Sequence, residues 1–180
     1  MTKTPKNIHL LLDDYAGKAS ETTAIKQYLH HYLVVEEEDV ADLLEEVAIE
    51  EMRHLEQLGH TLEEAGVDPR YWDSKKKYWT GAYVNYQENV CDILQADIEA
   101  ELGAILQYYQ HMEAICDPHV EMMLRKIIND ELRHISLFME KQAKYCPNCD
   151  HKSWLKKVIE KMPLDKLVKG QLVNDLRLTK

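Results

Sequence analysis

Apolar side chains recur at helical spacing through most of the chain and predict four long amphipathic helices. Gly66 and Pro69 mark the end of the second helix, and Asp117 with Pro118 marks the turn before the fourth. The expected bounds are 10 or 16 to 35, 39 to 65, 86 to 116, and 118 or 119 to 145. Short turns join the first helix to the second and the third to the fourth, whereas roughly twenty residues join the second to the third. This connectivity predicts an all-α four-helix bundle of two antiparallel hairpins joined by one long crossover.

The residues after the fourth helix differ in pattern and in charge. Pro147 is followed by a shorter amphipathic stretch at 153–162, then by Pro163 and a mixed tail. We therefore predict a bundle at 1–145 and a short C-terminal helical tail at 146–180, which contains a Cys-x-x-Cys pair. Residues 145–180 carry eight Lys and Arg against four Asp and Glu, whereas residues 1–144 carry 14 against 28. An acidic body argues against nucleic acid as a partner.

Length and hydropathy restrict the class of protein further. The 180 residues are enough for one domain with a proper core. The chain has no run of about 18 apolar residues, so we expect no transmembrane helix and no membrane partner. The start of the chain, MTKTPKNIHLLLDDYAGK, lacks the apolar stretch of a signal peptide, and the predicted location is cytoplasmic.

The two predicted hairpins repeat each other in sequence. Shifted by 80 residues, SETTAIKQYLHH (20–31) aligns with AELGAILQYYQH (100–111), and IEEMRHLEQL (49–58) aligns with NDELRHISLF (129–138). Neither half needs a gap. The bundle is therefore predicted to be a duplication of one helical hairpin.

Charged residues occupy the middle of apolar stripes at matching places in the two halves. Each half has one lone Glu and, thirty residues later, a Glu-x-x-His pair whose members share a helix face. Buried carboxylates without compensation would repel one another or take up protons, whereas two divalent cations would neutralise four of them. The six candidate metal ligands are Glu21, Glu51, His54, Glu101, Glu131 and His134. This donor set suits two iron or two manganese ions per chain, and zinc could also bind.

These motifs resemble those of the ferritin-like superfamily, especially its rubrerythrin, bacterioferritin and manganese-catalase-like members. The resemblance covers about residues 10–145 and implies a ferritin-like four-helix bundle. It also implies that Glu51 and Glu131 bridge the two ions, that Glu21 and Glu101 are terminal ligands, and that each His completes one ion.

The resemblance suggests roles for residues around the ligands. Glu50 and Asp130 occupy the positions that orient the opposite histidine in the family, although exposed helix charges are the alternative. Tyr28 and Tyr108 follow the lone glutamates by seven residues, where they could place a hydroxyl near peroxide, buffer a radical or simply pack in the core. Met52 stands where bacterioferritins have a methionine that binds haem between two subunits. Packing at a dimer interface is the favoured interpretation of Met52.

The chain also departs from rubrerythrins. Their additional Glu, one turn after the third-helix ligand, is replaced by Ala104 here, and Ala24 matches it in the first half. The ligand set is therefore more similar to that of bacterioferritins.

Four cysteines raise a separate question. Cys91 and Cys116 lie within helical patterns and are expected to be ordinary buried thiols. Rubrerythrins end in a rubredoxin domain with two Cys-x-x-Cys pairs, whereas this chain has only Cys146 and Cys149, and one pair cannot fill a tetrahedral metal site. Three interpretations stay open: a site completed by His151 and a neighbouring subunit, a dithiol that cycles with a disulfide, or a metal-free vestige.

Three functional hypotheses follow. The first is a di-metal oxidoreductase that reacts with hydrogen peroxide or dioxygen, of peroxidase or catalase type, and serves oxidative-stress defence; an electron-donor protein could supply it. The second is a ferroxidase and iron-storage protein that takes Fe(II). The third is a helical interaction module without metal chemistry. In that case, replacing Glu51 or Glu131 by Gln would leave the stability of the protein unchanged or raise it. A homo-oligomer, at least a dimer, is expected for the first two.

Overall fold

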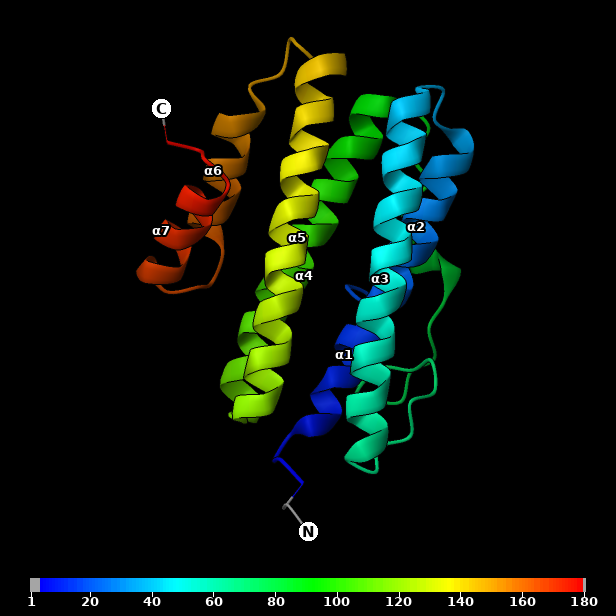
Figure 1. Ribbon diagram of the computed structural model, residues 1–180, viewed down its shortest axis with the longest axis vertical. Coiled ribbons are helices and arrows are strands. Elements are labelled where there is room, and N and C mark those ends of the chain that lie inside the picture. The colour runs from blue at the N-terminus through cyan, green and yellow to red at the C-terminus, as the bar shows by residue number, and fades with distance from the viewer. Residues whose placement is uncertain (1–3, 180) are drawn as a thin grey trace.

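The structure is a computed structural model that describes residues 4–179, and within this range it is all-α apart from one isolated β-bridge between Trp72 and Tyr78 (Figure 1). The expected four-helix bundle of two hairpins and a long crossover is confirmed. The α-helices are α1 (Leu11–Ala16), α2 (Glu21–Val34), α3 (Glu38–Glu64), α4 (Val90–Ile115), α5 (Pro118–Tyr145), α6 (His151–Lys161) and α7 (Lys166–Asp175). Two 3-10 turns, η1 (Ile8–Leu10) and η2 (Gly81–Tyr83), complete the elements. Among the described helices, none combines the length and the apolar character needed to cross a lipid bilayer.

Polar side chains fix the ends of the long helices. Ser20, Asn89 and Asp117 each accept a hydrogen bond from a backbone N–H in the first turn of α2, α4 and α5. Pro118 stands at the first position of α5, where its missing N–H costs nothing. Gly66, with φ of 74°, follows the end of α3 in the left-handed conformation that glycine adopts without strain.

The first predicted helix is broken, which corrects the expectation of one continuous segment from 10 or 16 to 35. Helix α1 ends at Ala16, and α2 begins only at Glu21. A Cβ atom at Gly17 would lie 2.5 Å from the backbone oxygen of Asp13, so only glycine fits this close turn. The break lets α2 start at the Ser20 cap and brings Glu21 into its first turn.

The core runs along the whole bundle, between the α2–α3 and α4–α5 hairpins. The crossover, residues 65–89, lies over α1 and α2. Trp79 Nε1 donates to Thr23 Oγ1 at 2.9 Å, and the backbone N–H of Asn85 donates to Gln27 Oε1 at 3.0 Å. These contacts attach the aromatic-rich crossover to the helix that carries Glu21.

The C-terminal tail is helical, as predicted, and forms α6 and α7 beside α5 (Figure 1). Leu155 and Ile159 from α6 and Leu172 from α7 are buried and join the same apolar core as the bundle. The division at 145 and 146 into two regions stays a prediction, and its outermost residues, 1–3 and 180, lie outside the described residues.

Candidate metal centre

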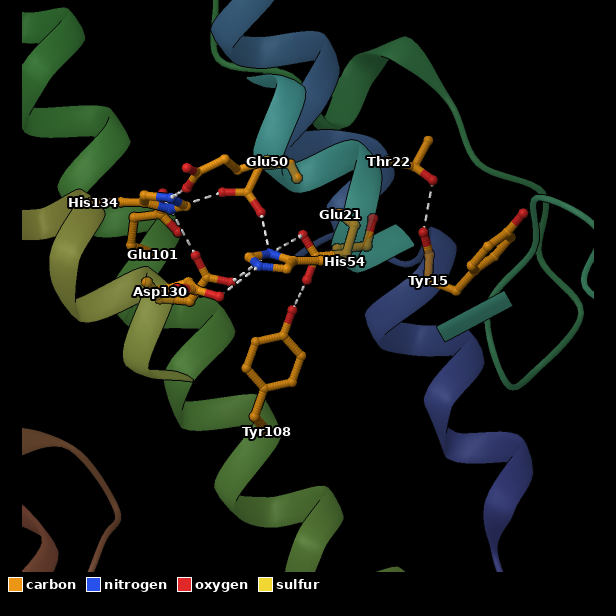
Figure 2. Close-up of polar contacts among 12 residues, drawn as sticks. Tyr15, Glu21, Thr22, Glu50, His54, Glu101, Tyr108, Asp130 and His134 are labelled. Atoms are coloured by element: carbon orange, nitrogen blue, oxygen red, sulfur yellow. Dashed lines mark hydrogen bonds and ion pairs between the residues drawn. The ribbon is translucent and has the colours of Figure 1, made fainter. Parts of the chain in front are cut away.

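Six buried side chains from four helices meet in the middle of the bundle. Figure 2 shows the rings of His54 and His134 close together, with Glu21 and Glu101 directed toward them. Their ligand atoms form two groups, and within each group these atoms lie within 4.8 Å of one another. One group is Glu21, Glu51, His54 and Glu131; the other is Glu51, Glu101, Glu131 and His134. Glu51 and Glu131 belong to both groups, so they occupy the space between the two lone glutamates.

The histidines present the same nitrogen to the cluster. His54 Nδ1 lies 2.8 Å from Glu51 Oε2 and 3.3 Å from Glu131 Oε1. His134 Nδ1 lies 2.9 Å from Glu131 Oε2 and 3.1 Å from Glu51 Oε1. Each shared glutamate is therefore in contact with both imidazoles, one from its own helix and one from the other hairpin.

Two buried carboxylate oxygens of this cluster accept no well-aligned hydrogen bond among the described residues, although each lies 3.1 to 3.3 Å from an imidazole Nδ1. They are Oε1 of Glu51 and Oε1 of Glu131. An unsatisfied carboxylate oxygen is costly to bury, whereas a bound cation satisfies it. Four carboxylates and two imidazoles also form a donor set that suits manganese or iron. The residues therefore fit a pair of divalent ions, and this buried Glu/His arrangement is consistent with di-manganese or di-iron.

In the absence of cations, burial and mutual repulsion of the carboxylates shift the pKa values of the cluster. Burial, followed by the charge of Glu51, raises the pKa of Glu21 to about 7. Burial and the charge of Glu131 raise the pKa of Glu101 well above its ordinary value. Although burial opposes it, contact with three glutamates raises the pKa of each histidine, His54 and His134, far above its ordinary value. Without cations, protons therefore stay in the cluster, and metal binding must displace them.

A carboxylate lies behind each histidine, at the nitrogen that faces away from the cluster. His134 Nε2 lies 2.8 Å from Glu50 Oε2, and His54 Nε2 lies 3.3 Å from Asp130 Oδ2 (Figure 2). Both contacts cross between α3 and α5, the helix pair in which the ligand motifs repeat. Partial burial opposes ionisation of Glu50, but His134 and the ion-paired Arg133 lower its pKa.

The two tyrosines that follow the lone glutamates contact the lone glutamate of the other half. The Tyr28 hydroxyl donates to Glu101 Oε1 at 2.6 Å, and the Tyr108 hydroxyl donates to Glu21 Oε1. Burial, then the charge of the contacted glutamate, raises the pKa of each phenol well above its ordinary value. The hydroxyls therefore stay protonated and hold Glu21 and Glu101 in place.

Two further buried networks, which the sequence interpretation missed, flank the cluster. Asp97 on α4 accepts a hydrogen bond from Gln27 at 2.9 Å and lies 2.9 Å from His31 Nδ1. Asp14 on α1 makes the matching contacts, with Gln107 at 2.8 Å and His111 at 2.6 Å. The glutamines and histidines occupy matching positions in the two halves of the repeat, and this identity was a sequence signal that they serve equivalent roles. The two aspartates are 83 positions apart rather than 80, so an ungapped alignment does not pair them.

Met52 lies apart from this centre, on the outer face of α3. Its side chain is 45% exposed, as is that of Ile49 one turn earlier. Whether Met52 binds haem or packs at a dimer interface stays a prediction.

The cysteines differ from expectation. Cys91 is not a free thiol, because it forms a disulfide with Cys146. Cys116 is exposed rather than buried, because it stands in the left-handed cap at the end of α4. Cys146 therefore pairs with a helix residue far away in sequence instead of with its neighbour Cys149. The sequence contains no signal for this pairing.

Known proteins are similar to this chain in fold and in sequence. A manganese catalase of Anabaena, KatB, superposes with a TM-score of 0.76 and 29% identity, over 82% of this chain and 76% of its own. A probable manganese catalase of Clostridium acetobutylicum is 23% identical over 194 residues, which cover 96% of this chain and 86% of the relative. A bacterioferritin of Desulfovibrio desulfuricans, described with a diiron site, has a TM-score of 0.65 and 24% identity over 84% of this chain and 85% of its own.

The duplicated hairpins, the buried Glu and His side chains and these structural neighbours agree on a ferritin-like di-metal protein. The rubrerythrin family profile matches residues 16–142, which is more than half of the sequence. The chain belongs to the rubrerythrin family.

Proposed function

We propose that this chain is a di-manganese catalase, which converts two molecules of hydrogen peroxide into two of water and one of dioxygen. The observation that carries the proposal is the pair of buried ligand groups that share Glu51 and Glu131. The choice of manganese and of catalase chemistry is supported by the likeness to the Anabaena manganese catalase, at 29% identity and a TM-score of 0.76.

In this proposal, Glu51 and Glu131 would contribute to holding both ions, because they are common to both groups. Glu21 and His54 would complete the ligand set of one ion, and Glu101 and His134 that of the other. A pair of redox-active ions held there would supply the two-electron chemistry that the disproportionation of peroxide requires. Because the cycle balances on peroxide alone, it needs no electron-donor protein.

The protein's own residues prepare the site. With Nδ1 of each histidine directed at the cluster, Glu50 and Asp130 accept a hydrogen bond from Nε2–H of His134 and His54, which fixes the tautomer and the ring orientation. Tyr28 and Tyr108 restrict the carboxylates of Glu101 and Glu21 through their hydroxyls. The ligands are thereby held in position before any cation arrives.

A cavity of about 770 Å³ between α2 and α4 supplies a path for a small substrate. It is lined by exposed residues, including Lys18 and Glu99, and by buried Glu21 and Glu101, so it leads from the surface to the ligands. Ala104 also lines it, at the position where the resemblance places an additional Glu in rubrerythrins. The small side chain leaves that space to the substrate.

Oxygen release tests the proposal. Manganese-loaded protein given hydrogen peroxide, with no added reductant, should release one dioxygen for every two peroxide molecules consumed, as measured with an oxygen electrode and a peroxide assay. The Glu131→Gln variant should lose this activity, whereas Glu46→Gln, which changes an exposed glutamate on the same α3 helix as Glu51, should keep it.

Two results would contradict the proposal. Peroxide consumption that releases no dioxygen and requires an added electron donor would indicate a peroxidase. Oxidation and retention of many Fe(II) ions per chain, with no dioxygen release from peroxide, would indicate a ferroxidase and storage protein of the ferritin type.

A further inference from the structure

Three of the four cysteines gather at one end of the bundle, away from the metal centre. Cys91 lies in the first turn of α4 and forms a disulfide with Cys146, directly after α5, with a Cα–Cα distance of 5.9 Å. Cys149, just before α6, has a free and exposed thiol. Cys116 caps the other end of α4, roughly 37 Å along the helix axis from Cys91.

The chain between Cys146 and Cys149 is a tight turn. The backbone N–H of Cys149 donates to the carbonyl oxygen of Cys146 at 3.2 Å, with Pro147 at the second position. In such a turn the outer Cα atoms are closer than about 7 Å, which includes the range over which disulfides form. Cys149 also lines two surface pockets, one together with Cys146 and the other together with Cys91. Cys149 therefore shares a surface pocket with each of the two bonded cysteines.

The three cysteines differ in access. Cys146 is only 4% exposed and Cys91 is half-buried, whereas Cys149 is exposed. A reducing protein that approaches from solvent meets the thiol of Cys149 before it can reach the disulfide.

We propose that Cys91, Cys146 and Cys149 form a thiol–disulfide exchange site through which a protein dithiol reduces the buried disulfide. The thiolate of Cys149 attacks Sγ of Cys146, the Cys91–Cys146 bond breaks, and a Cys146–Cys149 disulfide forms. Cys91 leaves as a thiolate and takes up the proton that Cys149 lost. The partial positive charge at the start of α4 stabilises this thiolate, which makes Cys91 the better leaving group. The external dithiol then gives two electrons and two protons to the Cys146–Cys149 disulfide and is itself oxidised to a disulfide.

The exchange changes what holds the hairpin together. The Cys91–Cys146 bond joins the start of α4 to the end of α5 across 55 residues of sequence. The new bond lies within one turn and joins no helices. The exchange thus releases a cross-link between the two helices that carry Glu101 and Glu131, while the metal ligands themselves are untouched.

Disulfide mapping on the full-length, metal-loaded protein tests this proposal. The oxidised protein is treated with dithiothreitol as the dithiol probe, quenched with acid at intervals, alkylated, digested and analysed by mass spectrometry. In the wild type, a Cys146–Cys149 linkage should appear transiently while Cys91 becomes alkylated. The Cys149→Ser variant should lose the Cys91–Cys146 bond at least tenfold more slowly. Cys116→Ser, which removes the distant free thiol, should behave as the wild type.

A second measurement does not depend on the folding of any variant. Wild-type protein kept without reductant at pH 8 and then alkylated should contain a fraction of chains with free Cys91 and bonded Cys146 and Cys149. The proposal is overturned if Cys91 stays bonded in every chain of that sample. It is overturned equally if Cys149→Ser is reduced as fast as the wild type.

Discussion

Protonation of Glu21 makes the stability of the metal-free protein depend on pH in a direction that the structure fixes. The side chain is only 2% exposed, and burial followed by the charge of Glu51 raises its pKa from 4.5 to about 7. The folded state therefore binds this proton more tightly than the unfolded chain does. Below pH 4.5 the carboxyl is protonated in both states and costs nothing. As the pH rises from 4.5 through 7, the folded state loses stability.

The size of this loss follows from the two pKa values. Each tenfold difference in proton affinity corresponds to about 1.4 kcal/mol, so the whole effect of Glu21 is about 3 kcal/mol, of which roughly 2 to 3 kcal/mol is lost between pH 5 and pH 8. The Glu21→Gln variant removes the ionisation and keeps an oxygen that can accept the hydrogen bond of Tyr108.

Urea unfolding of chelator-treated protein, followed by circular dichroism at pH 5 and pH 8, measures the effect. The free energy of unfolding of the wild type should fall by roughly 2 to 3 kcal/mol more over this interval than that of Glu21→Gln. The Glu46→Gln variant, altered at an exposed position, should follow the wild type. If the free energy of unfolding depends equally on pH in the wild type and in Glu21→Gln, the metal-free cluster does not hold a proton on Glu21, and the reasoning is refuted.

Four further substitutions test the roles of other residues. Glu50→Gln or Asp130→Asn should weaken metal binding roughly 10- to 100-fold, because a histidine loses its orienting carboxylate; competition with a chelator measures this, and unchanged affinity would contradict the assigned role. Tyr28→Phe removes a hydrogen bond to a buried carboxylate and should lower the free energy of unfolding of the loaded protein by about 1.5 to 3 kcal/mol in urea. Gly17→Ala should cost about 1 to 3 kcal/mol in the same assay, because its Cβ would collide with the backbone of the preceding turn; an unchanged midpoint would show that the turn can relax.

The helices of the bundle could be predicted because their apolar stripes are long. A periodic pattern over 26 to 28 residues, as in α4 and α5, leaves little ambiguity. The break at Gly17 was harder, because a glycine inside a helical pattern is a weak signal until the close approach to Asp13 is visible.

The residues of the candidate site could be grouped because the chain repeats itself. A duplicated Glu and Glu-x-x-His at one fixed shift places six polar side chains on interior faces, and the structure brings all six together. Asp14 and Asp97 could not be found this way, because their partners lie between 66 and 97 residues away and the hydrogen bonds exist only after the helices pack.

The disulfide lay beyond sequence reasoning for a similar reason. Cys91 occupies an ordinary position in an amphipathic pattern, and its distance from Cys146 depends on how α4 packs against α5. The neighbouring Cys146 and Cys149 suggested a local pair, but in the fold Cys146 is bonded to Cys91 on α4. Cysteine pairing is a tertiary property that spacing alone does not determine.

The number of metal ions bound per chain is the most direct test that the six buried Glu and His side chains form a di-metal site. It is measured by plasma mass spectrometry on protein purified without chelators and then incubated with Mn(II) or Fe(II). We expect two ions for each wild-type chain and a clear loss of bound metal in Glu131→Gln, because Glu131 belongs to both ligand groups. Wild-type protein that binds no metal after both incubations, or a Glu131→Gln variant that still binds two ions, would contradict it.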